Sequence, residues 1–265
     1  MITYVRQLPG FAEREQAELT YNIVVPTCEA TRAAMADVPA GPFIYGGLGE
    51  PMSEHPFRSD FYEMLHYVVE DVAQLPAFAI DRTEVSNVAF SLFAEMAKVT
   101  GIEKLSYYIN PTTVGADEPL KPAVMVDWFA ARAYCRFLGK ELPTNKQWSK
   151  AMRGGLALPD GTANLHARRN FPWGGEIRAR GHIAANGPVD VGTVPDDVSV
   201  YGVLDLAGNV IEWTASEAPL APGWMITRGG NYIETTRDTH VDFMVIENSR
   251  HTRARQFGLG FRCVR

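Results

Sequence analysis

Cysteine is scarce in this chain of 265 residues. Three cysteines, Cys28, Cys135 and Cys263, are too few for a disulfide scaffold, and no two of them form a Cys-x-x-Cys redox or zinc motif. Cys135 lies on the apolar face of an expected helix, so we expect its thiol to act as a small structural side chain. A cysteine pair formed only in space stays open, although no sequence feature argues for one.

Long apolar runs and excess positive charge are also missing. No run of twenty apolar residues predicts a membrane span. The 25 basic residues against 31 acidic ones give a net charge of −6, which does not favour nucleic acid or an acidic membrane as the main partner. The first ten residues lack the pattern of a signal peptide. The compartment is therefore unknown: the cytoplasm, or a larger exported or receptor chain.

Three helices are predicted from their end signals. Ser86 precedes the first, which Gly101 ends. Asp127 caps the second, and Thr144 caps the third with Gln147 placed for a capping box. No long helix is visible after residue 156.

The remaining elements are short, as the 23 glycines and 17 prolines suggest. We interpret residues 48–74 as an irregular acidic insertion with a helical patch near 61–72. Residues 1–37 form a leading strand segment or linker remnant, and residues 38–265 form the main domain. Strands are expected at 19–25, 43–45, 76–81, 189–194, 224–227 and 260–264.

The segment Asp205-Leu-Ala-Gly-Asn-Val-Ile-Glu-Trp213 has two interpretations of about equal weight. Oxygen ligands at 205, 209 and 212 suit calcium. Alternatively, the segment is a turn before a strand that carries Glu212 outward and Trp213 into the core.

Arginines are frequent towards the end of the chain. They suit an anion-binding patch, but the acidic residues among them (Asp238, Asp242 and Glu247) favour a salt-bridged loop region. The arginines are Arg228, Arg237, Arg250, Arg253, Arg255, Arg262 and Arg265.

The order of several short motifs resembles the formylglycine-generating-enzyme (sulfatase-modifying factor) family. They include Gly139-Lys-Glu-Leu-Pro-Thr, Arg228-Gly-Gly230 and Gly260-Phe-Arg262, besides the segment 205–213. Further similar segments lie at 38–43, 78–87, 122–135, 151–155, 171–175 and 201–204. The resemblance implies an α+β, C-type-lectin-like fold that is rich in loops.

The resemblance also marks what this chain has lost. The family's oxidases bind copper through a cysteine pair. The matching positions in this chain fall at about Glu234 and Thr239, and neither is a cysteine. Asn231 replaces the usual serine after Gly-Gly, and Ile211 replaces a tryptophan. Because Glu and Thr cannot perform thiolate chemistry, we expect no copper and no formylglycine synthesis.

The calcium interpretation gains from the same resemblance. A family calcium site is similar at matching positions, which here would use the side chains of Asp205 and Glu212 and the carbonyls of Gly208 and Val210. The resemblance therefore implies a structural calcium ion.

Family members without the cysteines suggest the function. We expect a non-catalytic, ligand- or protein-binding module of a sensory or regulatory kind, a pseudoenzyme that resembles modules attached to bacterial signalling kinases. A protein or small-molecule ligand would bind its C-terminal loops through Asn231, Tyr232, Glu234, Arg237, Asp238, His240 and Arg250.

Two alternatives stay open. One is an oxidoreductase that uses Tyr232, Glu234, Arg237 and His240 in the same cleft. The other is a variable ligand-display protein, because such proteins end in a similar Gly-Phe-Arg tail.

Overall fold

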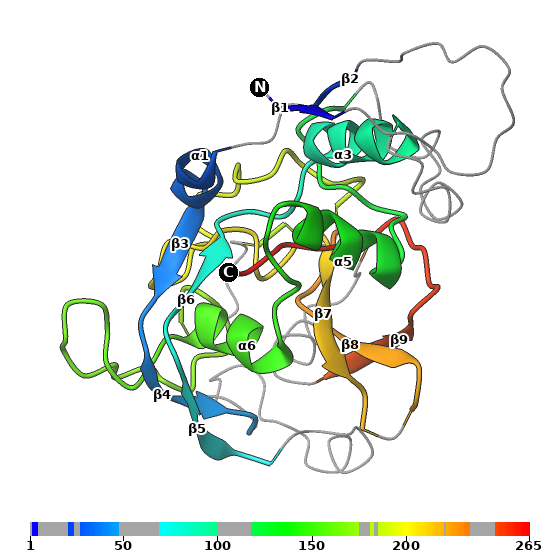
Figure 1. The fold of residues 1–265 in the computed structure, drawn as a ribbon. Coiled ribbons are helices and arrows are strands. Elements are labelled where there is room, and N and C mark those ends of the chain that lie inside the picture. The colour runs from blue at the N-terminus through cyan, green and yellow to red at the C-terminus, as the bar shows by residue number, and fades with distance from the viewer. Residues whose placement is uncertain are drawn as a thin grey trace, which may run out of the picture.

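The computed structural model describes residues 2–4, 21–23, 27–47, 69–99, 118–174, 181–182, 185–219, 221–233 and 247–265. The expected α+β class is confirmed: short helices and small sheets are joined by long connections (Figure 1). Within the described part of the chain, no helix is long and apolar enough to cross a membrane.

The three predicted helices are present, and their end signals act as expected. They are α3 (Asn87–Val99), α5 (Trp128–Phe137) and α6 (Asn145–Arg153). Asp127 accepts a hydrogen bond from the Ala130 backbone N–H at 3.0 Å. At α6, Thr144 and Gln147 form the reciprocal capping box. These caps fix where α5 and α6 begin, and α6 carries site residues in its first turn.

The strands form one four-stranded sheet and three pairs. The larger sheet has the order β10 (Leu259–Gly260), β7 (Ile211–Glu217), β8 (Trp224–Arg228), β9 (Asn248–His251), in which only β10 runs parallel to its neighbour. The pairs join β1 (Ile2–Tyr4) to β2 (Tyr21–Ile23), β3 (Met35–Val38) to β6 (Phe78–Asp81), and β4 (Gly41–Tyr45) to β5 (Asp71–Leu75).

Several local expectations were wrong. Residues 189–194 form turns rather than a strand. Leu92 continues the apolar spacing of the first predicted helix, which predicts an inward side chain, but it is 63% exposed. Asp71 and Val72, placed in a helical patch, belong to β5, while residues 48–68 lie outside the described part. The sequence pattern predicted neither α1 (Cys28–Ala33) nor β3.

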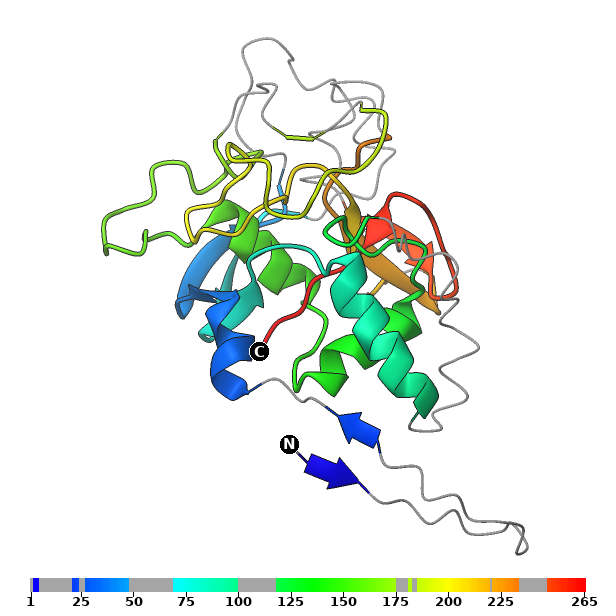
Figure 2. The ribbon, with the colours of Figure 1, turned by 90° about the horizontal axis from the view of Figure 1, so that it is seen from above.

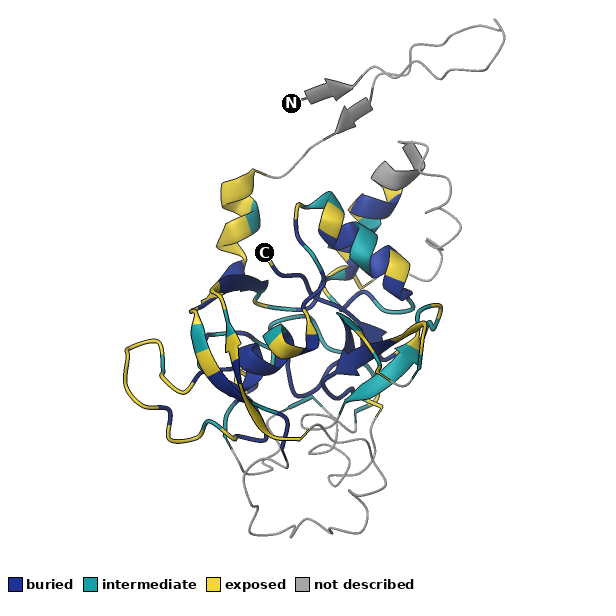
Figure 3. Ribbon diagram, turned by 60° about the horizontal axis from the view of Figure 1, so that its bottom comes forward, coloured by how far each residue is buried: buried dark blue, intermediate teal, exposed yellow. Residues whose placement is uncertain are grey.

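Two apolar clusters form the core, and the last residues of the chain belong to both. One cluster packs α3 and α5 against β7, and the other packs α6 against β3, β6 and the 201–207 loop. Phe261 and Cys263 lie in the first cluster and Val264 in the second. Figure 2 shows the C-terminal segment running between α6 and the pair α3 and α5, and Figure 3 shows that this centre is buried.

A disulfide ties this segment to α5. Cys135 and Cys263, 128 residues apart, are bonded to each other and fully buried. Cys135 is structural, as expected, but as half of a disulfide: the pair formed only in space, which the sequence left open, is present. The third cysteine, Cys28, is free and exposed on α1.

Candidate functional site

Three of the seven predicted ligand-binding residues lie in the described part of the chain. Asn231 and Tyr232 follow β8, and Arg250 lies in β9. The other four, Glu234, Arg237, Asp238 and His240, lie outside the described residues, as does Thr239.

The turn at residues 256–258 is the common neighbour of the three described residues. The Tyr232 hydroxyl donates to the Phe257 carbonyl at 3.4 Å, and Asn231 borders Gly258. Arg250 Nε donates to the Gln256 side chain at 2.8 Å. Beside them, Ile233 and Phe257 are 52% and 66% exposed. The structure thus places these predicted residues around one turn, where Phe257 of the turn and the neighbouring Ile233 are exposed apolar side chains.

A polar cluster that the sequence analysis missed lies at the junction of β4, α6 and β8. We call it the Glu247 cluster; it consists of Tyr45, Asn145, Arg228 and Glu247. The Tyr45 hydroxyl donates to Glu247, and Asn145 Nδ2 donates both to Glu247 and, at 2.7 Å, to the Tyr45 oxygen. In the antiparallel β8–β9 register Thr227 lies opposite Asn248. The next pair along this register places Arg228 opposite Glu247.

Burial governs the electrostatics of this cluster. Burial, followed by the hydrogen bond to Glu247, raises the pKa of Tyr45, so its hydroxyl stays neutral. Burial lowers the pKa of Arg228, while the charge of Glu247 opposes that effect. The Arg228 guanidinium lies 5.3 Å from the centre of the Trp148 ring and donates to Ser149 at 3.0 Å. Arg228 and Glu247 are therefore placed as a compensating charge pair.

One backbone feature explains the Arg-Gly-Gly motif beside this cluster. Gly229 has a φ of +85°, and a Cβ at this position would lie 3.1 Å from the Leu206 carbonyl oxygen. Arg228 was visible in that motif, but nothing in the sequence linked it to Tyr45 or Asn145. Those partners become neighbours only through tertiary packing.

A second polar centre lies inside the molecule, around Arg262. Its guanidinium donates to both oxygens of Glu212, at 2.6–2.9 Å, and to the carbonyls of Asp81, Arg82, Leu204 and Asp205. Trp148 Nε1 adds a bond to Glu212 at 2.9 Å. Glu212 is completely buried, so the alternative in which it points outward was wrong, whereas Trp213 is in the core as that alternative had it.

More carboxylates surround Arg262 than its one charge can balance. Asp205 and Glu84 are also buried, and neither Asp205 Oδ1 nor Glu84 Oε1 has a hydrogen-bond donor among the described residues. Burial and the nearby Asp205 charge raise the pKa of Glu84 well above its usual value. Burial also raises the pKa of Asp205 and raises that of the neighbouring Asp197 to about 7. The centre therefore favours either a held proton or an added cation.

The four predicted calcium ligands adjoin this centre. Asp205 and Asn209 have φ angles of +55° and +59°, which form the turn between the ligand positions. Asp205 Oδ2 already accepts a bond from the Gly192 backbone, and the oxygens of Glu212 are taken by Arg262 and Trp148. No group of three or more His, Cys, Asp or Glu side chains suited to a metal occurs among the described residues. The calcium site stays a prediction.

The fold and the loop surface together define the class: a C-type-lectin-like α+β domain. A solved structure, that of CarF, matches 87% of this chain and 97% of its own with a TM-score of 0.61 and 18% identity, which supports the shared fold. The sequence model of the family described as "Sulfatase-modifying factor enzyme 1-like domain" matches residues 21–265, and the chain belongs to that family. The sequence predicted a boundary between a leading segment, residues 1–37, and a main domain, residues 38–265. Both the family match and β3 extend across this boundary, which stays a prediction.

Two curated relatives differ in what their names say they do. Inactive C-alpha-formylglycine-generating enzyme 2 from Bos taurus is 37% identical over 154 residues, covering 54% of this chain and 50% of the relative. Hercynine oxygenase from Mycolicibacterium smegmatis is 30% identical over 212 residues, covering 70% of this chain and 45% of the relative. The chain thus spans about half the length of these relatives, and their names include both an inactive protein and an oxygenase.

Proposed function

We propose that this chain is a non-catalytic, regulatory binding module on the sulfatase-modifying-factor scaffold. The position of its cysteines carries the proposal. Cys135 and Cys263 are bonded to each other in the core, and Cys28 lies on α1. Since the chain has no other cysteine, no thiol pair remains to hold copper beside the loops after Gly230.

The binding surface would be the 256–258 turn with the Glu247 cluster. Exposed Ile233 and Phe257 offer apolar contact beside the polar groups of Asn231 and Tyr232. Predicted residues Glu234, Arg237, Asp238 and His240 would complete this surface. A protein segment or a small molecule with both apolar and polar groups suits such a mixed surface.

A copper titration tests the proposal. Reduced copper(I) is held by bicinchoninate, and the protein competes for it, with Cys28→Ser removing the exposed thiol. We expect no copper transfer to Cys28→Ser in stoichiometric amount. Transfer of one equivalent would mean that another copper site exists and would contradict the proposal.

The oxygenase-named relative supports a second candidate, an oxidoreductase that uses Tyr232 and the predicted Glu234, Arg237 and His240. Oxygen consumption with hercynine separates the two candidates. Uptake above that of protein alone, lost in His240→Ala, would favour the oxidoreductase. No uptake favours the binding module. A variable ligand-display role would instead be supported by a reverse-transcriptase gene beside this one.

The link to a bacterial signalling kinase is part of the proposal and rests on motif resemblance alone. The buried disulfide bears on the compartment, because such bonds are typical of proteins that fold in oxidising compartments. Of the two locations left open by the sequence, we therefore favour the larger exported or receptor chain.

We also propose a structural calcium ion near Asp205. The residues fit in part: Asp205 Oδ1 is buried with no donor among the described residues, but Glu212 would have to give up bonds to Arg262. The carbonyls of Gly208 and Val210 would supply further ligands. Calcium added after chelator treatment should raise the melting temperature, and Asp205→Asn should abolish that rise. An unchanged melting temperature would contradict the calcium proposal and would mean that Arg262 alone supplies the positive charge of this centre.

A further inference from the structure

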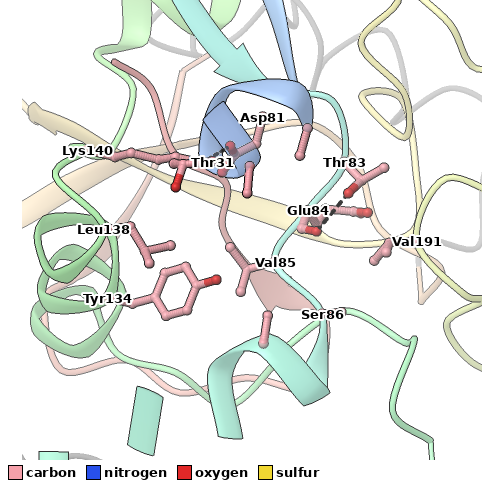
Figure 4. Close-up of a pocket in the computed structure, with 13 residues that line it drawn as sticks. Thr31, Asp81, Thr83, Glu84, Val85, Ser86, Tyr134, Leu138, Lys140 and Val191 are labelled. Carbon is pink, nitrogen blue, oxygen red and sulfur yellow. Dashed lines mark hydrogen bonds and ion pairs between the residues drawn. The ribbon is translucent and has the colours of Figure 1, made fainter. Parts of the chain in front are cut away.

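A pocket of about 290 Å³ lies between α1, the connection at residues 81–86 and α5 (Figure 4). This volume is near the lower limit of pockets that hold small molecules, which is about 300 Å³. The pocket shares no residue with the Glu247 cluster or with the 256–258 turn. A ligand of this pocket would therefore be distinct from the one proposed for that surface, although Asp81 and Glu84 also border the Arg262 centre.

Small side chains keep the pocket open on the α1 side. Ala30 of α1 and Ala34, the residue that caps its C-terminal end, line the pocket, and no residue of that helix is buried. Short helices are usually stabilised by packing of an apolar face, yet the inner face of α1 lies over this space. Val85 and Leu138 supply apolar walls opposite.

Tyr134 places a hydroxyl at this pocket. Its ring is held by edge contacts with Phe93 and Phe261, at centroid distances of 5.5 Å in both cases. The residue is 7% exposed, and its hydroxyl points out of the aromatic cluster towards Val85 and Ser86 (Figure 4). No described residue forms a hydrogen bond with this hydroxyl. Because burial raises the pKa of Tyr134, the hydroxyl remains a neutral donor.

The charges at the pocket cancel each other. Lys140 Nζ donates to Asp81 Oδ1 at 2.5 Å, and both side chains are largely buried. Glu84 is 2% exposed, and its Oε2 accepts a hydrogen bond from Asn209 Nδ2 at 3.4 Å. An ionic ligand would find no unbalanced partner here, and its desolvation would be unfavourable.

We propose that this pocket binds a small neutral molecule with an apolar body and a carbonyl-type acceptor, which takes the hydrogen bond of the Tyr134 hydroxyl. The small side chains of α1 would cover the apolar body. An acceptor at this position would replace water at the Tyr134 hydroxyl, and a hydrogen bond formed in this way contributes about 0.5–1.5 kcal/mol.

Three probes of similar shape test this proposal: benzamide, benzoate and benzamidine. They are titrated into the full chain, and binding is measured from backbone amide shifts in NMR spectra. We expect millimolar binding of benzamide, with shifts at α1 and residues 81–86, and much weaker binding of the two ions. If benzamide causes no shift at millimolar concentration, or if an ion binds as well as benzamide, the proposal is wrong.

Three variants locate the binding. Ala34→Phe fills the pocket and should abolish the benzamide shifts, whereas Ala33→Phe, on the same exposed helix but outside the pocket, should keep them. Tyr134→Phe should weaken benzamide roughly five-fold, as expected for one hydrogen bond, and leave the binding of toluene unchanged. Equal binding of benzamide to Ala34→Phe and Ala33→Phe would overturn the assignment to this pocket.

Discussion

Arg262 is the residue on which the buried centre depends. It is fully buried and bonded to both oxygens of Glu212. Arg262→Met leaves Glu212 as an uncompensated buried charge, which is expected to lower the free energy of unfolding by about 3–5 kcal/mol. Urea denaturation measures this change.

The control for this prediction is an arginine at the surface. Arg136 pairs with Glu141, and both side chains are exposed. Arg136→Met should change the free energy of unfolding by about 0–1 kcal/mol. Equal losses in the two variants would contradict the special role of the Arg262 pair.

The raised pKa values of Glu84 and Asp197 predict how the stability of the protein depends on pH. Their pKa values are raised in the folded protein, that of Asp197 to about 7. A raised carboxyl pKa gives stability that is present below the unfolded pKa, near 4, and is lost as pH rises through the folded value. We therefore expect these two groups to make the protein less stable at pH 8 than at pH 5.

Glu84→Gln isolates one of these contributions. The amide resembles the protonated carboxyl, so the variant should lose less stability than the wild type between pH 5 and pH 9. Urea denaturation at each pH measures the difference, and Glu29→Gln, on the exposed α1, should follow the wild type. A variant curve parallel to that of the wild type would show that Glu84 is ionised throughout.

At the scale of elements, the capping box positions the polar cluster. Thr144 and Gln147 begin α6, whose first residue, Asn145, bonds to Tyr45 and Glu247. Thr144→Ala should lower the free energy of unfolding by about 1 kcal/mol. Thr144→Ser keeps the hydroxyl and should change it by only a few tenths of a kcal/mol. Thermal or urea unfolding of both variants measures the effect, and similar losses would contradict the capping role.

The elements that the sequence predicted best have local causes. The starts of α5 and α6 were recognisable because Asp127 and Thr144 bond to residues three positions away. The strand expected at 189–194 failed for the opposite reason, since Val189 and Gly192 donate their backbone N–H groups to Asn209 and Asp205 rather than to a strand.

The polar centres were harder to predict. Arg262 and Glu212 each belong to recognisable motifs, but their pairing spans 50 residues and depends on the parallel contact of β10 with β7. Tyr45 and Glu247 are 202 residues apart. Sequence spacing contains no information on contacts of that range, so residues such as Asn145 were missed.

At the scale of the molecule, the C-terminal segment joins the two apolar clusters, and the Cys135–Cys263 disulfide secures it. Closing a loop of this length restricts the unfolded chain. Replacing both cysteines by alanine should therefore lower the free energy of unfolding by about 2–5 kcal/mol. Cys28→Ala is the control and should have little effect, because Cys28 is exposed and free. Unchanged unfolding of the double variant would mean that packing alone holds this segment.

A turnover measurement distinguishes a binding module from an active oxidase. The purified chain is incubated with copper(I), oxygen and a cysteine-containing sulfatase peptide, and the peptide is analysed by mass spectrometry. The peptide cysteine is expected to remain unconverted, as it does without protein. Conversion to formylglycine at a rate that scales with protein concentration would contradict the binding-module proposal.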